Sequence, residues 1–143
     1  MSEEIVRLEG VNKIYQTGDT TITALAKTDI SFHANKLTLI MGPSGSGKTT
    51  LLSILGCVIY PTSGKVYYKN QEVTKWNEDQ LADLRLKEIG FVFQQFNLIE
   101  PLNALENVMQ PLTLQNIETH TARERSIKAL EAVGLGERMK NLP

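Results

Sequence analysis

Residues 42–49 read Gly42-Pro43-Ser44-Gly45-Ser46-Gly47-Lys48-Thr49, a full match to the Gly-x-x-x-x-Gly-Lys-Ser/Thr pattern of phosphate-binding loops. Glycine adopts backbone conformations that other residues avoid, so successive N–H groups of such a loop can point at phosphate oxygens. The loop should lead directly into a helix, whose N-terminus has unpaired N–H groups and a dipole that favours anions. This stretch therefore predicts a site for a phosphate-bearing ligand.

Apolar runs and turn residues flank this loop. Residues 37–40, Leu-Thr-Leu-Ile, precede it and predict a strand buried on both faces of a parallel sheet. A helix is expected after it, from Lys48 to about Val58, because Pro61 and the turn behind it end the helical pattern. The run Phe91-Val92-Phe93 predicts a further short buried strand. Strands that alternate with helices indicate the α/β class.

The first third of the chain is rich in strand patterns, and a hairpin pattern follows later. Weak alternation over residues 5–10, the run Ile30-Ser31-Phe32 and a hairpin over residues 66–73 all predict strands. Asn77 is then expected to cap a helix, since Asn satisfies the first unpaired N–H groups well. Its apolar positions are Leu81, Leu84 and Leu86.

Two helices are expected in the C-terminal third. The first begins near Asn103 and is interrupted by Pro111, whose ring and missing N–H disturb the helical hydrogen bonds. The second begins with a capping box at Thr121-Ala122-Arg123-Glu124. Gly134 is expected to end it, with Leu135 in apolar contact beyond the cap.

Composition excludes several classes of protein. The 143 residues include 15 Lys or Arg and 16 Asp or Glu, and this balance argues against a nucleic-acid-binding protein. The single cysteine, Cys57, cannot form an internal disulfide, which favours a reducing compartment. The acidic N-terminus does not resemble a signal peptide, and the longest apolar stretch, residues 51–60, is too short to span a bilayer. These features predict a cytoplasmic protein that meets a membrane only through a partner.

The residue types of the loop suggest individual roles toward a nucleotide. Lys48 is expected to reach the β- and γ-phosphates, and the Thr49 hydroxyl to bind Mg²⁺. Thr50 offers a second hydroxyl and a donor near the α-phosphate. The loop by itself leaves GTPases, kinases, motor ATPases and transporter ATPases open.

Further stretches separate these classes. They are the run from Gly42 to Leu52, the turn Pro61-Thr62-Ser63-Gly64, the stretch Ile89-Gly90-Phe91-Val92-Phe93-Gln94, and the segments Asn97-Leu98 and Leu105-Glu106-Asn107-Val108. With them, the chain resembles the ATP-binding subunits of ABC transporters over essentially its whole length. Within that family it is most similar to the lipoprotein-release and macrolide-exporter branch, judged from Thr23-Ala24-Leu25 and residues 91–98.

The resemblance implies an α/β fold of the P-loop ATPase type with an N-terminal antiparallel β subdomain. The implied ligands are ATP and Mg²⁺. The residues expected to bind the nucleotide are Tyr15, Gly42, Ser44, Gly45, Ser46, Gly47, Lys48, Thr49, Thr50 and Gln94. Thr49 and Gln94 would bind the metal, and Gln94 would also contact the attacking water. Tyr15 would stack on adenine, because an aromatic face is a platform for a base.

The resemblance also implies how the chain is organised, as the N-terminal part of one ATP-binding domain over residues 1–143. It places the phosphate loop at residues 42–50, the Q-loop at about 94–101 and the start of a helical subdomain at about 103–143. The segment after Gln94 would receive the membrane subunits of the transporter. In its complete form, the domain would pair with a second copy and couple ATP hydrolysis to transport at the cytoplasmic face of the cell membrane.

Three features of the family's pattern do not occur in the 143 residues. They are the Leu-Ser-Gly-Gly-Gln signature, the apolar run ending in Asp-Glu, and the switch histidine, for which His33 and His120 lie too early. The chain is therefore expected to be a domain truncated before the signature. Without the general base it should bind ATP without sustained turnover, since such a base contributes about 10²–10⁴ in rate.

The resemblance also implies that the two apolar central strands, at residues 37–40 and 91–93, are separated by strands that this sequence does not contain. Both strands would then have unpaired edges, which favour aggregation or strand exchange. We therefore expect the isolated chain to fold by swapping, dimerising or rearranging.

Three interpretations of function follow. The chain is the ATP-binding part of a transporter ATPase, or a non-hydrolysing nucleotide-binding or interaction fragment, or a P-loop kinase or GTPase. A GTPase would need an Asn-Lys-x-Asp motif, and Asn12-Lys13-Ile14-Tyr15 lacks the Asp and precedes the loop. Affinity without turnover would favour the second interpretation for the chain itself. The transported substrate cannot be read from this sequence, because membrane subunits would select it.

Overall fold

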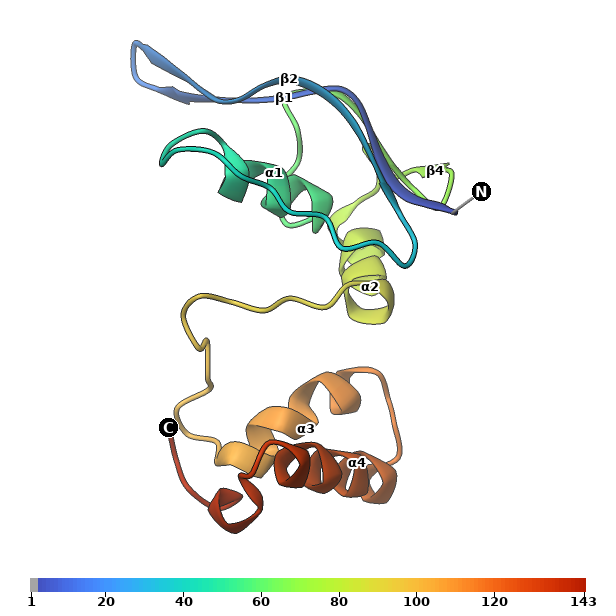
Figure 1. Ribbon diagram of the computed structural model, residues 1–143, viewed down its shortest axis with the longest axis vertical. Coiled ribbons are helices and arrows are strands. Elements are labelled where there is room, and N and C mark those ends of the chain that lie inside the picture. The colour runs from blue at the N-terminus through green and yellow to red at the C-terminus, as the bar shows by residue number, and fades with distance from the viewer. Residues whose placement is uncertain (1–2) are drawn as a thin grey trace. The chain divides into compact units, whose positions relative to one another are not determined.

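The computed structural model describes residues 3–143, which form two compact units (Figure 1). The first unit extends to Arg85 and the second runs from Leu86 to Pro143. Up to residue 77, the elements are β1 (Glu4–Thr17), β2 (Thr20–His33), α1 (Lys48–Leu55), β3 (Ser63–Tyr68) and β4 (Gln71–Glu72). Helix α2 (Glu78–Glu88) crosses the boundary, and α3 (Ala104–Leu114), α4 (Thr119–Ala132) and a short 3₁₀ helix η1 (Gly136–Arg138) follow.

The first unit is built on a four-stranded antiparallel sheet in the order β2-β1-β3-β4. This confirms the expected N-terminal antiparallel subdomain. The hairpin expected over residues 66–73 is also present, as β3 and β4. Its two turn residues, Lys69 and Asn70, have φ of 45° and 66°, which suits the right-handed twist of a two-residue hairpin.

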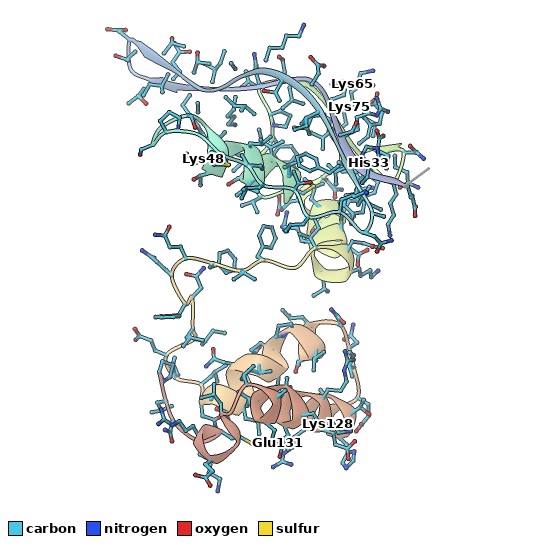
Figure 2. The ribbon with its side chains drawn as sticks, viewed as in Figure 1. His33, Lys48, Lys65, Lys75, Lys128 and Glu131 are labelled. Atoms are coloured by element: carbon cyan, nitrogen blue, oxygen red, sulfur yellow. The ribbon has the colours of Figure 1, made fainter. Side chains whose placement is uncertain are left out.

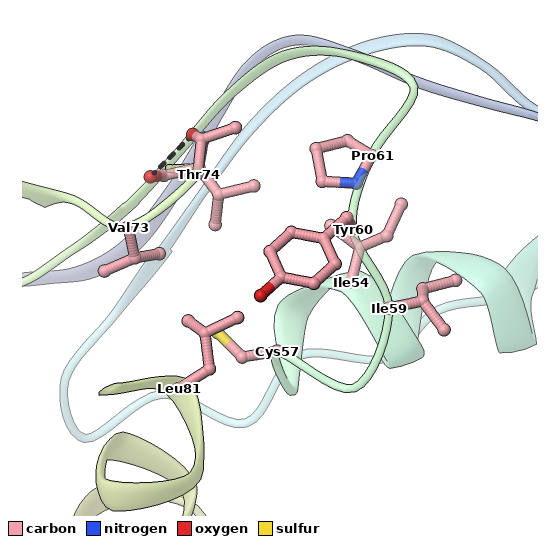
Figure 3. Close-up of a pocket in the computed structure, with 9 residues that line it drawn as sticks. Ile54, Cys57, Ile59, Tyr60, Pro61, Val73, Thr74 and Leu81 are labelled. Carbon is pink, nitrogen blue, oxygen red and sulfur yellow. Dashed lines mark hydrogen bonds between the residues drawn. The ribbon is translucent and has the colours of Figure 1, made fainter. Parts of the chain in front are cut away.

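Helices α1 and α2 cover one side of this sheet (Figure 1), and the core of the first unit lies between the sheet and these two helices. Its most buried side chains include Leu8 and Val11 of β1, Ile54 of α1, Val66 of β3 and Leu81 of α2. A cavity of about 10 Å³, the size of one water molecule, is lined by Ile54, Cys57, Ile59, Tyr60, Pro61, Val66, Val73, Thr74 and Leu81 (Figure 3). A void of this size has room for no more than about one water molecule.

Cys57 lies in the same core and is buried, as expected for a packing residue. Burial raises the pKa of its thiol, so the side chain stays neutral. Its φ of 54° places it in the left-handed region directly after Gly56, the C-cap of α1. The helix therefore ends at Leu55, three residues before the predicted end at Val58.

Two strands were predicted, one at residues 37–40 before the phosphate loop and one at residues 91–93, and both predictions are wrong. Residues 37–40 and 91–93 have no regular structure, and no described strand pairs with either segment. Leu37 and Val92 are fully exposed. A strand requires a neighbour for its N–H and C=O groups, and apolar composition alone does not supply one.

The expected cap of α2 is confirmed in detail. Asn77 Oδ1 accepts a hydrogen bond from the N–H of Gln80, at 2.9 Å, and Gln80 Oε1 accepts one from the N–H of Asn77, at 3.0 Å. Asn103 and Glu106 form the same reciprocal arrangement at the start of α3. In both helices two N–H groups without a helical acceptor are satisfied by the side chains of the first turn.

Two details of the later helices differ from the prediction. Helix α3 continues through Pro111 to Leu114, because a proline close to the end of a helix disturbs few hydrogen bonds. Helix α4 begins at Thr119, so Thr121 does not cap it. The cap is Glu118, which accepts from the N–H groups of His120 and Thr121, and these bonds lower its pKa.

The predicted end of α4 is confirmed. Gly134 has φ of 75°, and its N–H donates to the carbonyl of Glu131 at 3.0 Å. The N–H of Leu135 donates to the carbonyl of Leu130 at 2.8 Å, which completes a Schellman motif. Glycine is favoured here because the left-handed conformation strains other residues.

Candidate functional site

The glycine-rich loop is positioned for anion binding by the start of α1. Gly45 and Gly47 have φ of 79° and 88°, in the region that glycine tolerates best. Gly47 is the N-cap of α1, and no side chain caps the helix. The first N–H groups of α1 therefore remain available for a ligand, and the helix dipole adds a positive potential at this end.

A bulge in β2 brings a neighbouring strand against this loop. Lys13 of β1 pairs with Leu25 and Ile14 pairs with Thr23, so Ala24 is the extra residue of the bulge. A Cβ on Gly47 would lie 2.6 Å from the carbonyl oxygen of Ala24. Glycine is therefore required at position 47 for two reasons, its φ and this close approach.

Lys48 lies at the start of α1 (Figure 2), and its side chain reaches back to the loop that precedes it. Its Nζ donates to the carbonyl oxygens of Gly42, at 2.8 Å, and Pro43, at 2.6 Å, and lies 3.4 Å from Ser46 Oγ. An ammonium has three donors, and all three point at oxygens of the loop. Phosphate oxygens can replace these neutral acceptors with charge-assisted hydrogen bonds, which are stronger.

A hollow of about 450 Å³ lies over the loop and the start of α1. It is lined by Ser44, Gly45, Gly47, Lys48, Thr49 and Thr50, and also by Ile22, Thr23 and Ala24 of β2. Six of the ten predicted nucleotide-binding residues therefore share one surface. Gly42 and Ser46 do not line the hollow but hold the Lys48 ammonium.

The three β2 residues of the hollow were not predicted as site residues. They carry no charge and match no binding motif, so no local signal distinguishes them from other strand residues. Their place in the site depends on the bulge at Ala24 and on the approach of Gly47, which are tertiary features.

Tyr15 lies on β1 beside this hollow. Its Cα partner on β2 is Ile22, one of the lining residues, and 42% of Tyr15 is exposed. Lys13, two residues earlier on the same strand, places its Nζ 5.0 Å from the centre of the Tyr15 ring. The aromatic ring is thus partly open to solvent, and Tyr15 pairs in the sheet with a residue that lines the hollow.

The turn at residues 61–64 fixes β1 near the site. Thr62 Oγ1 accepts from the N–H of Ile14, at 2.9 Å, and the N–H of Thr62 donates to the carbonyl of Asn12, at 2.9 Å. Gly64 has φ of 88°, and a Cβ there would lie 2.4 Å from the carbonyl oxygen of Gly10. The residue types of this turn therefore follow from its contacts with β1.

The donors near the loop suit a metal that is shared with a ligand. Among residues 3–143, no group of three His, Cys, Asp or Glu side chains could hold a metal ion. The Thr49 hydroxyl lies at the hollow, and Mg²⁺ commonly combines one or two protein oxygens with phosphate oxygens and water. This donor set fits Mg²⁺ bound together with a nucleotide.

Gln94 belongs to the second unit, in the irregular segment that precedes α3, and its side chain is exposed. Several apolar side chains in the same segment are also exposed. They are Phe91, Val92, Phe93, Phe96, Leu98 and Ile99. An exposed apolar segment of this kind is typical of a surface that is covered by a partner.

Asn107 of α3 holds the end of this segment. Its Oδ1 accepts from the N–H of Ile99 at 2.8 Å, and its amide group donates to the carbonyls of Leu102, at 2.8 Å, and Asn103, at 3.1 Å. A weaker donation to the carbonyl of Ile99, at 3.2 Å, completes the set. One side chain therefore satisfies four backbone interactions in a segment without regular structure.

Replacing Asn107 with alanine is expected to speed amide hydrogen exchange at Ile99 by roughly 2- to 13-fold, because one hydrogen bond contributes about 0.5–1.5 kcal/mol. Asn107→Asp keeps an acceptor for that N–H but turns a carboxylate oxygen toward the carbonyls of Leu102 and Asn103, so it should also lose protection at Ile99. Exchange measured by NMR or mass spectrometry checks this. Equal protection in Asn107→Ala and the unmodified chain would contradict the assigned role.

Three features place the protein in the phosphate-loop class: the glycine-rich loop, the uncapped helix and the lysine over the hollow. A family model described as ABC transporter matches residues 25–143. The chain therefore belongs to the ABC transporter family. It corresponds to the N-terminal portion of the family's ATP-binding domain, which is of the P-loop ATPase type.

Individual relatives agree with this assignment. The lipoprotein-releasing system ATP-binding protein LolD of Idiomarina loihiensis is 36% identical over 143 residues, 100% of this chain and 63% of that protein. The macrolide export ATP-binding/permease protein MacB of Syntrophobacter fumaroxidans is 39% identical over 142 residues, 98% of this chain and 20% of that protein. The predicted branch of the family is confirmed.

A solved structure is similar over nearly the whole chain. It is a dimer of the ATP-binding cassette MJ0796 from Methanocaldococcus jannaschii in a post-hydrolysis state, bound to ADP and Pi. The TM-score is 0.88 at 41% identity, over 96% of this chain and 61% of that chain. This likeness confirms the predicted fold class.

The chain spans about 60% of the length of the separate ATP-binding proteins that it matches. Within residues 3–143, none of the helices has both the length and the apolar composition that crossing a membrane requires.

Proposed function

We propose that the chain binds MgATP at the hollow over residues 44–50. The observation that carries this proposal is the combination of an uncapped α1 N-terminus with the Lys48 ammonium held over the loop. Both features favour a polyanion, and the hollow of about 450 Å³ offers room for one beside β2.

The residues of the loop would act as follows. Lys48 would exchange its loop carbonyls for the β- and γ-phosphate oxygens, while Gly45 and Gly47 leave the backbone N–H groups free to approach them. The Thr49 hydroxyl would bind Mg²⁺, which supplies charge neutralisation at the phosphates. Thr50 would donate to the α-phosphate.

Tyr15 would stack on the adenine base. Support comes from its exposed ring and from its pairing with Ile22, which lines the hollow. Base stacking on an aromatic ring is worth about 1–3 kcal/mol. In this arrangement the phosphates and the base are bound by different elements of the first unit, the loop and the β1–β2 ribbon.

Further roles belong to the whole protein and rest on the family. Gln94 would contact Mg²⁺ and the attacking water, and the apolar segment after it would receive the membrane subunits of a transporter. The protein would thereby attach to the cytoplasmic face of the cell membrane, and two ATP-binding domains would pair during hydrolysis. The dimer of MJ0796 bound to ADP and Pi supports this proposal by analogy.

For the 143 residues alone, we propose nucleotide binding without sustained turnover. No Leu-Ser-Gly-Gly-Gln sequence and no apolar run ending in Asp-Glu occurs in them. The general base that would deprotonate the attacking water and the signature's contact with the γ-phosphate are therefore not supplied. Phosphate release that continues over many turnovers and disappears in Lys48→Ala would overturn this part.

Titration calorimetry tests the binding proposal with three ligands. MgATP and magnesium tripolyphosphate should both bind, because the loop recognises phosphates, and adenosine should bind far more weakly. ATP should exceed tripolyphosphate in affinity by roughly 5- to 150-fold, the factor that base stacking supplies. Failure of both phosphate ligands to bind to folded chain would refute the proposal.

A further inference from the structure

Lys13 makes two contacts that together fix its position beside Tyr15. Its Nζ donates to the carbonyl oxygen of Tyr60 at 2.8 Å. The same Nζ lies 5.0 Å from the centre of the Tyr15 ring. Because a cation within about 6 Å of an aromatic face is attracted to it, Lys13 holds one face of this ring.

The acceptor of Lys13 is itself anchored in the first unit. Tyr60 follows α1, and its hydroxyl donates to the carbonyl of Trp76 at 3.0 Å. The neighbouring Thr62 is bound to the backbone of Ile14 through its hydroxyl. The ammonium of Lys13 is therefore placed by the segment that follows α1 and not by β1 alone.

We propose that Lys13 is a positioning residue for recognition of the purine base, which acts through Tyr15 by holding one face of the ring and leaving the opposite face for the base. The inference rests on the proposed function, because it requires a nucleotide in the hollow. The inference goes beyond the proposed function by assigning a role to Lys13, a residue that does not line the hollow.

Two physical effects support this role. The ammonium restricts the side-chain freedom of Tyr15, so less conformational entropy is lost when a base stacks on the ring. The cation also withdraws electron density from the ring, which favours an electron-rich partner on its other face. Both effects act on the base and leave the phosphates unaffected.

The experiment compares Lys13→Gln and Lys13→Arg by titration with MgATP and with magnesium tripolyphosphate. Glutamine keeps a donor for the Tyr60 carbonyl and removes the charge, whereas arginine keeps both. Lys13→Gln should weaken ATP binding by roughly two- to fivefold, at most the value of an exposed cation–π contact, and leave tripolyphosphate unchanged. Lys13→Arg should retain the affinity for ATP. Lys27→Gln, another exposed lysine of the ribbon, controls for net charge.

A double-mutant cycle with Tyr15→Leu decides whether Lys13 acts through the ring. Lys13→Gln should have no further effect on ATP affinity once the ring is gone. An equal loss in both backgrounds, or an equal loss for tripolyphosphate, would overturn the inference while leaving the binding proposal intact. Absence of tripolyphosphate binding in the unmodified chain would instead refute the proposed function.

Discussion

Replacing Lys48 with alanine is expected to weaken MgATP binding by roughly 10- to 150-fold. The ammonium is held by the carbonyls of Gly42 and Pro43 and would transfer to phosphate oxygens on binding. Hydrogen bonds to charged groups contribute about 1.5–3 kcal/mol, which corresponds to this factor. Titration calorimetry with MgATP and with magnesium tripolyphosphate measures it, and both ligands should lose affinity by the same factor.

The same substitution separates binding from folding. Trp76 is the only tryptophan, so its fluorescence reports urea unfolding of the first unit. Lys48→Ala removes hydrogen bonds at an exposed loop and should change the free energy of unfolding by less than about 1 kcal/mol. Lys27→Ala serves as a control that removes a charge elsewhere in this unit. Unchanged nucleotide affinity in folded Lys48→Ala would refute the assignment of the loop.

The phosphate loop could be predicted from sequence because its chemistry is local. The glycines, the lysine and the start of the helix lie within eight residues, and each is required by backbone geometry or by charge. The caps at Asn77 and Gly134 were predictable for the same reason, since each satisfies N–H or C=O groups of its own turn.

The strands at residues 37–40 and 91–93 were not predictable in the same way. Their apolar composition is correct for buried strands, but a strand is defined by its neighbours, and no strand of the described residues pairs with them. The proposal that the chain folds by swapping, dimerising or rearranging remains a prediction. The exposed side chains of Leu37 and Val92 are the surfaces that such a rearrangement would cover.

The cap of α4 shows a different failure. Thr121 and Glu124 match a capping box, in which Glu124 would accept from the N–H of Thr121. Glu118 accepts from that N–H instead, and its second carboxylate oxygen accepts from the N–H of His120. A carboxylate at a helix N-terminus also interacts favourably with the dipole, so the earlier start has the lower energy. The contact between Lys13 and the Tyr60 carbonyl was not predictable, because the two residues are 47 positions apart and meet only in the folded unit.

Replacing Gly47 with alanine is expected to lower the free energy of unfolding of the first unit by about 2–5 kcal/mol. The left-handed conformation accounts for about 1–2 kcal/mol, and overpacking against the Ala24 carbonyl, 2.6 Å from the new Cβ, for a further 1–3 kcal/mol. Relief would require the bulge of β2 to move away from the loop. Urea unfolding followed by Trp76 fluorescence measures the effect.

Gly18→Ala is the matched control for this prediction. Gly18 also has positive φ, 58°, but nothing lies within 4 Å of a Cβ there, so its loss should be about 1–2 kcal/mol. The difference between the two variants isolates the close approach of Gly47 to Ala24. Since that approach closes the hollow on the β2 side, Gly47→Ala should also weaken tripolyphosphate binding, whereas Gly18→Ala should not. Equal destabilisation by the two substitutions would mean that the loop and the bulge do not hold each other in place.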